Sequence, residues 1–501
     1  MPTLKLTLTA TDNECFTIVA KNYATENSKL PFFDDQGNSH LRAVINSLNA
    51  LTNQYSDNND KKWMIAEGLL SETDTNSFHG QMRENIGKKL YQALFTGNIE
   101  KALNKEFGKE EDLHIQIEYD FRVSANSKLS LYPWHLVHDG NEFLSKNRVT
   151  FSYRILDNTN YPRKKRQINK LKVLVISSQA FDDDQIQLQN QESLINDSLK
   201  KSQDQGRACL LSWYKPGEKP TFKRLRGYLT DHSKQADKLP DIIHFNGHGV
   251  FQDQSGFLLF EDEKGKPDHI SAEDFKDLID ICNPKPQLVV ITACQAALAH
   301  KSDSVFNGVA QKLLQIVPAV VATPFSISQD STTDFIDQFY RVLGNGQSSL
   351  LEAVKFASKA MKHKQYEWYR LVLFLRHDGD EDGYLFDFQE TQLQPGIPQK
   401  KELEVLDIAT LKDLLKRCRI ITTNRIVREN FCQSIGIEID DISSDSVASL
   451  GDNLFIDTLL GYLERTDNTS AFYQLCVTLE PHFKSSSTLA NKLQVIKNKF
   501  M

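Results

Sequence analysis

The sequence of 501 residues lacks three features that would each place it in a distinct class of protein. It has no apolar stretch close to the roughly 20 residues that span a bilayer, which argues against a membrane protein. Its seven cysteines form no CxxC pair, which argues against a disulfide framework or a zinc ribbon. Basic residues are not in excess, since 59 Lys and Arg stand against 66 Asp and Glu, so a direct nucleic-acid partner is disfavoured.

What the sequence does contain is typical of a soluble protein of several domains. Hydrophobic residues make up 40% of the chain and include 29 Phe and 15 Tyr, enough to build a core, and the length corresponds to roughly two to four domains. The N-terminal segment MPTLKLTLTATDNE has no basic region followed by an apolar one, so we expect no signal peptide. Scattered, unpaired cysteines favour the reducing cytoplasm, and we expect no metal and no other cofactor.

The first third of the chain mixes strand and helix patterns. Apolar and polar residues alternate over 1–10, 112–123 and 148–154, a period of two that predicts half-buried strands. Helical periodicity is present over 40–53 and 81–105.

After residue 170 the pattern changes to short, nearly continuous apolar runs separated by polar stretches that favour helices. The runs are 172–176, 208–213, 241–246, 287–293, 318–322 and 371–375. Buried strands alternating with helices predict an α/β fold, in which a mostly parallel sheet is covered by helices on both faces.

We divide the chain into four segments on these patterns. They are an N-terminal half over 1–165, a second half over 166–388, a Pro- and Gly-containing linker over 389–402, and a helical domain over 403–501. In the last segment the strand pattern is gone and five helices are expected. They are 407–418, 423–433, 452–464, 469–479 and 485–499.

A histidine and a cysteine follow two neighbouring apolar runs. Gly247-His248-Gly249 comes after IIHFN, and Cys294 comes after LVVITA. Functional residues of parallel sheets gather at the carboxyl ends of the strands, so we expect the imidazole and the thiol at the same edge. A neighbouring histidine can activate a thiol as a nucleophile. The flanking glycines are expected to turn the backbone sharply, and the amides of Gly249 and Cys294 are candidate oxyanion donors.

These motifs resemble those of a known family. HFNGHG and ITACQAA, with the histidine 46 residues before the cysteine, are similar to the catalytic motifs of CHAT domains, caspase-like cysteine proteases of clan CD related to separase. The segments PWHLVHDGNEFL, KLKVLVISS, PTFKRLRGYL, GFLLFED, PAVVATPFSISQDSTTDFIDQFYRVL and EWYRLVLFLRHDGD occur in that family's order. The resemblance implies two caspase-like halves, of which the first lacks catalytic residues. It also implies His248 as general base and acid, Cys294 as nucleophile, and a protein substrate cleaved through a thioester.

The C-terminal segment has a resemblance of its own. NFCQSIGIEIDDI and FIDTLLGYLERTDNTSAFYQLCVTLEPHF are similar to the effector-associated domains of prokaryotic conflict systems, which are death-domain-like helical adaptors. This implies a partner that carries a like domain, or self-association, and a role in defence signalling.

Several residues have two interpretations. Cys294 is a catalytic thiol or a buried cysteine at a strand end. Asp330 caps the helix that follows PAVVA, which we favour, or lines a specificity pocket for a basic residue before the cleaved bond. The basic run ending at Arg166 is a solvated linker or a site of self-cleavage. His244 is expected to make a hydrogen bond in the core.

The function likewise has alternatives. We favour a cysteine endopeptidase, because both members of the His248–Cys294 pair are present. A non-catalytic scaffold that only binds partners, and an esterase or amidase that uses the same pair on small molecules, are the competing hypotheses.

Overall fold

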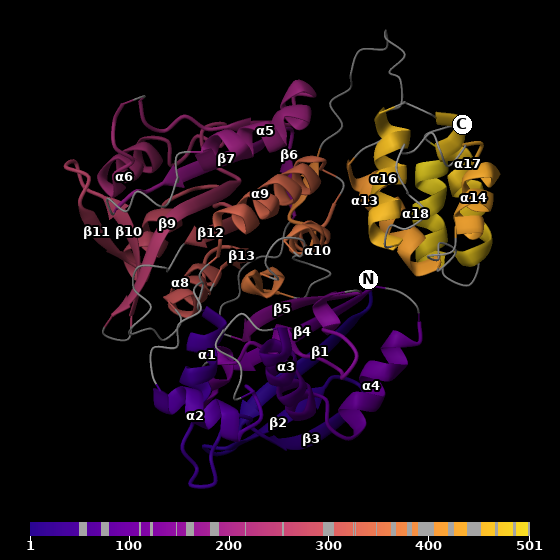
Figure 1. Cartoon of the computed structure of the whole chain (residues 1–501). Helices are drawn as coiled ribbons and strands as arrows, with labels where there is room; N and C mark the ends of the chain where they lie inside the picture. The colour runs from indigo at the N-terminus through magenta and orange to yellow at the C-terminus, as the bar shows by residue number, and fades with distance from the viewer. Residues whose placement is uncertain are drawn as a thin grey trace. The chain divides into compact units, whose positions relative to one another are not determined.

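A computed structural model of the chain describes most of its residues. The described ranges are 1–49, 58–71, 80–109, 112–120, 124–146, 148–156, 165–180, 190–215, 217–252, 255–293, 305–323, 325, 327–346, 348–361, 367–377, 383–388, 405–418, 425–437, 452–465, 469–483 and 487–498. The chain divides into two compact units, residues 1–108 with 112–391 and residues 109–111 with 392–501 (Figure 1). The boundary expected at 165/166 lies inside the first unit and stays a prediction, and the expected linker lies outside the described residues.

Among its described residues, the first unit is built on one sheet of 13 strands (Figure 1). The strands are β1 (Thr3–Ala10), β2 (Cys15–Ala20), β3 (Ala24–Lys29), β4 (Leu113–Asp120), β5 (Val149–Leu156), β7 (Leu171–Ser177), β8 (Ala208–Leu210), β9 (Ile242–Gln252), β10 (Ser255–Glu261), β11 (Pro267–Ser271), β12 (Leu288–Ala293), β13 (Ala319–Ala322) and β14 (Val372–Leu375). Their order is β11-β10-β9-β12-β13-β14-β5-β4-β1-β2-β3, with β7 also paired to β9 and β8 to β7. A separate two-stranded ladder pairs β6 (Arg166–Ile168) with β15 (Phe386–Phe388).

The sheet is mostly parallel, which confirms the predicted α/β class. The pairs that join β8, β7, β9, β12 and β13 are parallel, as are those that join β14, β5, β4 and β1. Antiparallel pairs lie toward the two edges and between β13 and β14. Burial follows position: β1 alternates, with Leu4, Leu6 and Leu8 buried, whereas β13 and β14 are buried throughout.

Ten described helices belong to this unit. They are α1 (Leu41–Asn49), α2 (Asn58–Ala66), α3 (Gly80–Leu94), α4 (Asn98–Phe107), α5 (Asn190–Asp204), α6 (Phe222–Asp231), α7 (Ala272–Asp280), α8 (Val305–Leu314), α9 (Gln329–Gly344) and α10 (Leu350–Ala360). Short 3-10 helices are η1 (Ser124–Leu131), η2 (Trp134–Leu136), η3 (Leu144–Lys146) and η4 (Trp368–Arg370). The helical periodicity expected over 81–105 is confirmed by α3 and α4, which are separated at Gly97, where φ is 56°.

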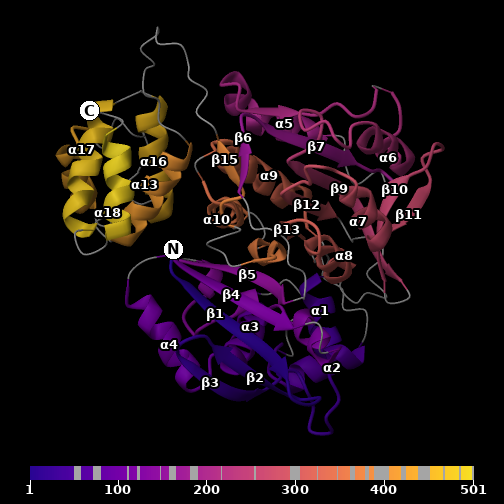
Figure 2. The same ribbon diagram turned by 180° about the vertical axis from the view of Figure 1, so that it is seen from behind.

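Helices lie on both sides of the sheet (Figures 1 and 2), and contacts between aromatic rings assign some of them to its two faces. The ring of Phe245 on β9 lies 5.2 Å from that of Phe260 on β10, which lies 6.1 Å from Phe275 on α7. The preceding residue, His244, points to the opposite face, where it contacts Tyr340 of α9. Helix α8 packs on β10 and β13, and α5 packs on α9. Helices therefore cover both faces.

One buried carboxylate joins the start of β7 to the start of β9. Asp241 is fully buried, and its carboxylate forms ion pairs of 3.1 Å with both Arg166 and Lys172. It also accepts a hydrogen bond of 2.9 Å from the backbone amide of Lys172. Because both cations are largely buried too, each charge depends on the others for compensation.

Replacing Asp241 with Ala should destabilise the first unit by about 3–5 kcal/mol, because it leaves two partly buried cations without their carboxylate. Urea unfolding followed by tryptophan fluorescence measures this, since all four tryptophans lie in the first unit. Asp277→Ala is the control, because it breaks an ion pair with Lys276 in which Asp277 is 67% exposed, and should cost less than about 0.5 kcal/mol. Equal effects of the two variants would contradict the prediction.

The described residues of the second unit are helical. Its helices are α13 (Val405–Cys418), α14 (Arg425–Ser434), α16 (Asp452–Arg465), α17 (Thr469–Leu479), η6 (Glu480–Phe483) and α18 (Ser487–Lys497), which confirms the five expected helices. Leu411, Phe455, Leu459 and Leu475 are among the residues of their shared core. No helix in the described part of the chain is both long enough and apolar enough to cross a membrane.

Candidate functional site

His248 lies within β9 and not in a turn after it. The sharp turn expected at the flanking glycines is wrong, because β9 continues to Gln252. The strand stays extended because its partner changes: β7 pairs with it up to Asn246, and from His248 onward β10 takes over, with Leu259 opposite His248 and Leu258 opposite Gly249. His248 therefore lies just beyond the carboxyl end of β7, at the point where β9 begins to form a hairpin with β10.

The face on which His248 lies follows from the same pairing. Residues directly opposite each other in a ladder place their side chains on one face. Phe260 faces α7, so its neighbour Leu259 faces the other side, and His248 shares that side with Leu259. This is the face on which His244 meets α9. The imidazole of His248 is buried, with the residue 4% exposed.

The strand that leads to the cysteine lies beside β9. Residues Leu288 to Ala293 of β12 pair in parallel with Ile242 to Gly247, so the last residue of β12 is opposite the residue before His248. Cys294 follows Ala293 directly in the sequence and lies outside the described residues. The side-by-side placement of the two strands agrees with the expectation. The roles of His248, Cys294 and the Gly249 amide stay predictions.

Gly247 is required for close packing and not for a turn. A Cβ atom at this position would lie 2.9 Å from Cζ of Phe245 and 3.3 Å from Cβ of Ser178, and the first distance is shorter than real Cβ contacts. The glycine therefore leaves room for the ring of Phe245 on the same strand and, less tightly, for Ser178 after β7.

His244 forms the core hydrogen bonds that were expected of it. Its Nδ1 lies 2.7 Å from the hydroxyl oxygen of Tyr340, and its Nε2 lies 2.8 Å from Oγ1 of Thr292 on β12. Thr292 in turn donates to Oε1 of Gln191 on α5 at 3.4 Å. Burial lowers the pKa of His244 from its ordinary 6.5 to about 3, so the ring is neutral at physiological pH. In the described part of the chain, no three His, Cys, Asp or Glu side chains are grouped to hold a metal ion.

The helix cap expected at Asp330 is instead Ser328. The Ser328 side chain accepts a hydrogen bond of 3.3 Å from the amide of Ser331, which makes it the N-cap of α9. The prediction missed it by two residues because Ser and Asp are both good caps. Asp330 is an exposed residue in the first turn of α9, where its charge suits the helix dipole. Its place in a specificity pocket stays a prediction.

Arg166 is the first residue of β6 and is anchored on both sides. Beside its ion pair with Asp241, its guanidinium donates to the carbonyl of Lys285 at 3.0 Å, and its backbone amide donates to the carbonyl of Leu385. Cleavage after Arg166 stays a prediction, and it would require this strand to detach first.

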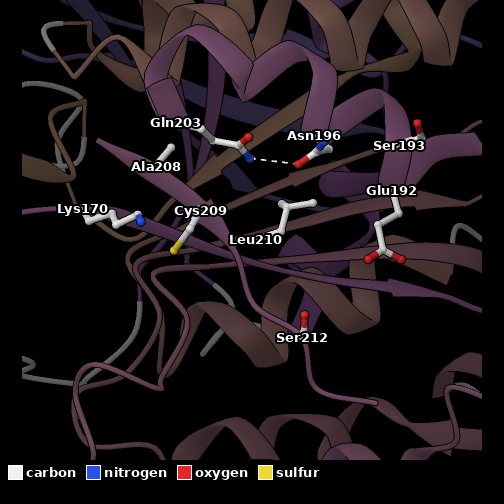
Figure 3. A pocket seen from close by; sticks show the side chains of 9 residues that line it. All are labelled: Lys170, Glu192, Ser193, Asn196, Gln203, Ala208, Cys209, Leu210 and Ser212. Atoms are coloured by element: carbon white, nitrogen blue, oxygen red, sulfur yellow. Dashed lines mark hydrogen bonds between the residues drawn. The ribbon is translucent and has the colours of Figure 1, made fainter. Parts of the chain in front are cut away.

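An open cleft of about 570 Å³ lies along the edge strand β8 and helix α5 (Figure 3). Its lining residues are Lys170, Glu192, Ser193, Asn196, Gln203, Ala208, Cys209, Leu210 and Ser212. His248 is not among them, so this cleft is not the expected site.

Ser178 is a residue of this region that the sequence analysis missed. It follows β7, is fully buried, and its amide donates to the carbonyl of Asn246 at 2.8 Å. Its hydroxyl has no hydrogen-bond partner among the described residues. The signal was present, because Ser178 follows an apolar run as His248 and Cys294 do.

The buried His244 predicts a specific acid sensitivity. Below pH 6.5 His244 is protonated in the unfolded chain, whereas in the folded protein it stays neutral down to about pH 3. The folded state therefore loses stability as the pH falls from 6.5 to 3. His244→Gln should reduce the slope of the free energy of unfolding against pH in this range by as much as about 1.4 kcal/mol per pH unit. Urea unfolding between pH 4 and 7 measures the slope, with His269→Gln, at an exposed side chain, as the control. An unchanged slope in the His244 variant would refute the assignment.

Comparison with known proteins identifies the region that holds these residues. A family model described as the CHAT domain matches residues 84–393. Among curated proteins the chain is similar to a Roc-COR-CHAT protease from an unknown prokaryotic organism, with 29% identity over 133 residues. That match covers 25% of this chain and only 11% of the relative's length.

Several solved structures resemble the chain at low sequence identity. The Arg-specific cysteine proteinase gingipain R has a TM-score of 0.36 at 13% identity and covers 58% of this chain and 68% of its own. The Drosophila initiator caspase Dronc has a TM-score of 0.27 at 12% identity and covers 45% and 87%. The Saccharomyces cerevisiae separase–securin complex has a TM-score of 0.36 at 12% identity and covers 75% and 30%.

Proposed function

The chain belongs to the CHAT domain family, and on that premise we propose that it is a cysteine endopeptidase that cleaves a protein partner with His248 and Cys294. The observation that carries the proposal is the pairing of Ala293 with Gly247, which brings the strand leading to Cys294 to the residue before His248. The matched region contains both residues, and the curated relative is a protease by name.

The proposed reaction uses the pair in sequence. His248 removes the proton from the Cys294 thiol, and the thiolate attacks the carbonyl carbon of the scissile peptide bond. The amides of Gly249 and Cys294 hold the negative charge that forms on the carbonyl oxygen. His248 then donates its proton to the departing amine, which leaves a thioester. Water, deprotonated by His248, attacks the thioester and releases the carboxylic acid and the thiol.

Two features of the fold suit these roles. His248 lies on an extended strand with partners on both sides, so its position is well defined before a substrate binds. It is also largely buried, and electrostatic interactions in such a site are stronger than in water.

Cys294→Ala and His248→Ala should each lower the rate of peptide cleavage by at least about 10³-fold, because each removes a partner of the covalent step. A peptide library and the protein products of neighbouring genes are the substrates, with cleavage detected by mass spectrometry. Cys209→Ser, which changes a partly exposed thiol elsewhere in the unit, is the matched control and should retain activity. No cleavage by the wild type under any activating condition would favour the scaffold, and turnover of esters but not peptides would favour the esterase.

We assign the second unit the role of a helical adaptor in defence signalling, of the effector-associated, death-like type. Its support is the sequence resemblance together with the separate core of its described helices, in which Arg428 is fully buried, pairs with Asp452 at 2.8 Å and stacks on Phe455. The partner would carry a like domain, or be a second copy of the chain. Asp330 would face a basic residue before the cleaved bond, and Arg166 would be a site of self-cleavage.

Deleting residues 401–501 should leave peptide cleavage by the first unit unchanged and abolish capture of the partner. The reason is that the two units have separate cores, so loss of one leaves the other intact. Pull-down of neighbouring gene products by the full chain and by the truncated chain measures recruitment. Unchanged capture after the deletion would refute the adaptor role.

A further inference from the structure

The segment Glu367–Arg370, here called the 367–370 clamp, carries two buried charges that contact different helices. Glu367 and η4 immediately precede β14. The side chains of Glu367 and Arg370 are each 1% exposed, and Nε of Arg370 lies 3.7 Å from Oε1 of Glu367. Such a pair costs desolvation and is no stronger for stability than an apolar replacement. Since the pair does not account for stability, we look for its role in the groups that Glu367 and Arg370 contact.

Glu367 holds the beginning of α9. Its Oε2 accepts hydrogen bonds from both the amide and the hydroxyl of Ser328, at 2.9 Å and 2.6 Å. Ser328 is the N-cap of α9, so the carboxylate lies at the positive end of a helix of 16 residues. A charge-assisted hydrogen bond of this kind is stronger than a neutral one.

The other end of the clamp holds the end of α1. The hydroxyl of Tyr369 donates to the carbonyl of Leu48 at 2.8 Å, and the guanidinium of Arg370 donates to the carbonyl of Asn49 at 3.3 Å. These are carbonyls of the last turn of α1, which have no partner within the helix and favour a cation. The carbonyl of Tyr369 lies 2.6 Å from Nε2 of the buried His135 on η2. The clamp thus ties the N-terminal part of the unit to α9.

The residues before Ser328 lie at the carboxyl edge of the parallel strands. Thr323 follows β13, and its amide donates to the carbonyl of Ile291 on β12 at 3.1 Å. The ring of Phe325 packs against that of Tyr369, with centroids 5.7 Å apart. Phe325 and Ser328, which lie between β13 and α9, are therefore both held by the clamp, next to the strand that leads to Cys294.

We propose that the 367–370 clamp positions the substrate-binding wall of the proposed protease, with Glu367 acting through Ser328 and Arg370 anchoring Glu367 to α1. The wall comprises Thr323, Phe325 and the residues from Ile327 to the first turn of α9, including Asp330. Glu367 and Arg370 are positioning residues and touch no reacting atom. The predicted effect on substrate binding rests on the proposed function. The contacts by which the clamp holds Phe325 and Ser328 are independent of it.

The first experiment tests the link without using activity. Glu367→Gln keeps the shape of the side chain but removes the charge, so backbone amide hydrogen exchange in the peptide 323–332 of the full chain should accelerate by about tenfold or more. Asp112→Asn is the matched control, because it breaks another buried ion pair of the same unit, Lys355–Asp112 at 2.5 Å, and should leave exchange in 323–332 unchanged. Tyr369→Phe, which removes the hydrogen bond of the clamp to Leu48 and leaves the N-cap of α9 intact, should give a smaller acceleration and serves if Glu367→Gln does not fold. Unchanged exchange in the folded variants overturns the link.

The second experiment tests the consequence for substrate. Peptidyl acyloxymethyl ketones with Arg, Lys or Asp next to the reactive group alkylate catalytic thiols, and their labelling of Cys294 gives an inactivation rate and an apparent binding constant. Glu367→Gln should weaken binding by about tenfold with the maximal inactivation rate little changed, while Asp112→Asn should change neither. If Glu367 has only a structural role, Glu367→Gln and Asp112→Asn should change the binding constant and the inactivation rate to the same extent. That result would overturn the proposal. Failure of the wild type to be labelled at all would refute the proposed function, while the exchange result would still decide the link.

Discussion

The arrangement of the candidate site depends on the pairing of β9. This strand has β12 along one side, and along the other it has first β7 and then β10. The chain stays extended through Gly247, His248 and Gly249, because β10 continues the pairing where that with β7 ends. His248 is thereby placed at the carboxyl edge of the parallel strands without being in a loop. A side chain at position 247 would collide with the ring of Phe245 on the same strand, so glycine is required there.

Buried polar groups then hold the helices in place around this strand. Asp241 ties the beginnings of β7 and β9 to β6, and His244 ties β9 to β12 and α9. The carboxylate of Glu367 connects α9 to the N-terminal part of the same unit. Each of these groups is fully or almost fully buried, so each needs its partners, and the partners come from elements far apart in the sequence. A substitution that removes one of them leaves the others unpaired in the interior.

Local patterns were sufficient for much of the fold. The apolar runs at 172–176, 241–246 and 287–293 became β7, β9 and β12, and the five helices of the second unit lie where periodicity places them. The errors occurred where local signals compete. Helical periodicity over 81–105 does not show that Gly97, with its positive φ, separates α3 from α4, and two good capping residues stood two positions apart at the start of α9. The glycines around His248 were expected to favour a turn, whereas β9 continues through both, and Gly247 leaves room for the ring of Phe245.

The sequence by itself determined the class of fold, the placement of His248 and of the residue before Cys294 on neighbouring strands, and the existence of a separate helical unit. These follow from periodicity and from the rule that parallel strands end at a common edge. Only the tertiary structure decided that His248 shares a face with His244, that Arg166 is anchored by Asp241, and that Glu367 contacts Ser328. The physical reason is that side-chain pairs of this kind join residues tens of positions apart. No local pattern encodes them, because each partner is selected only by the packing that brings it close.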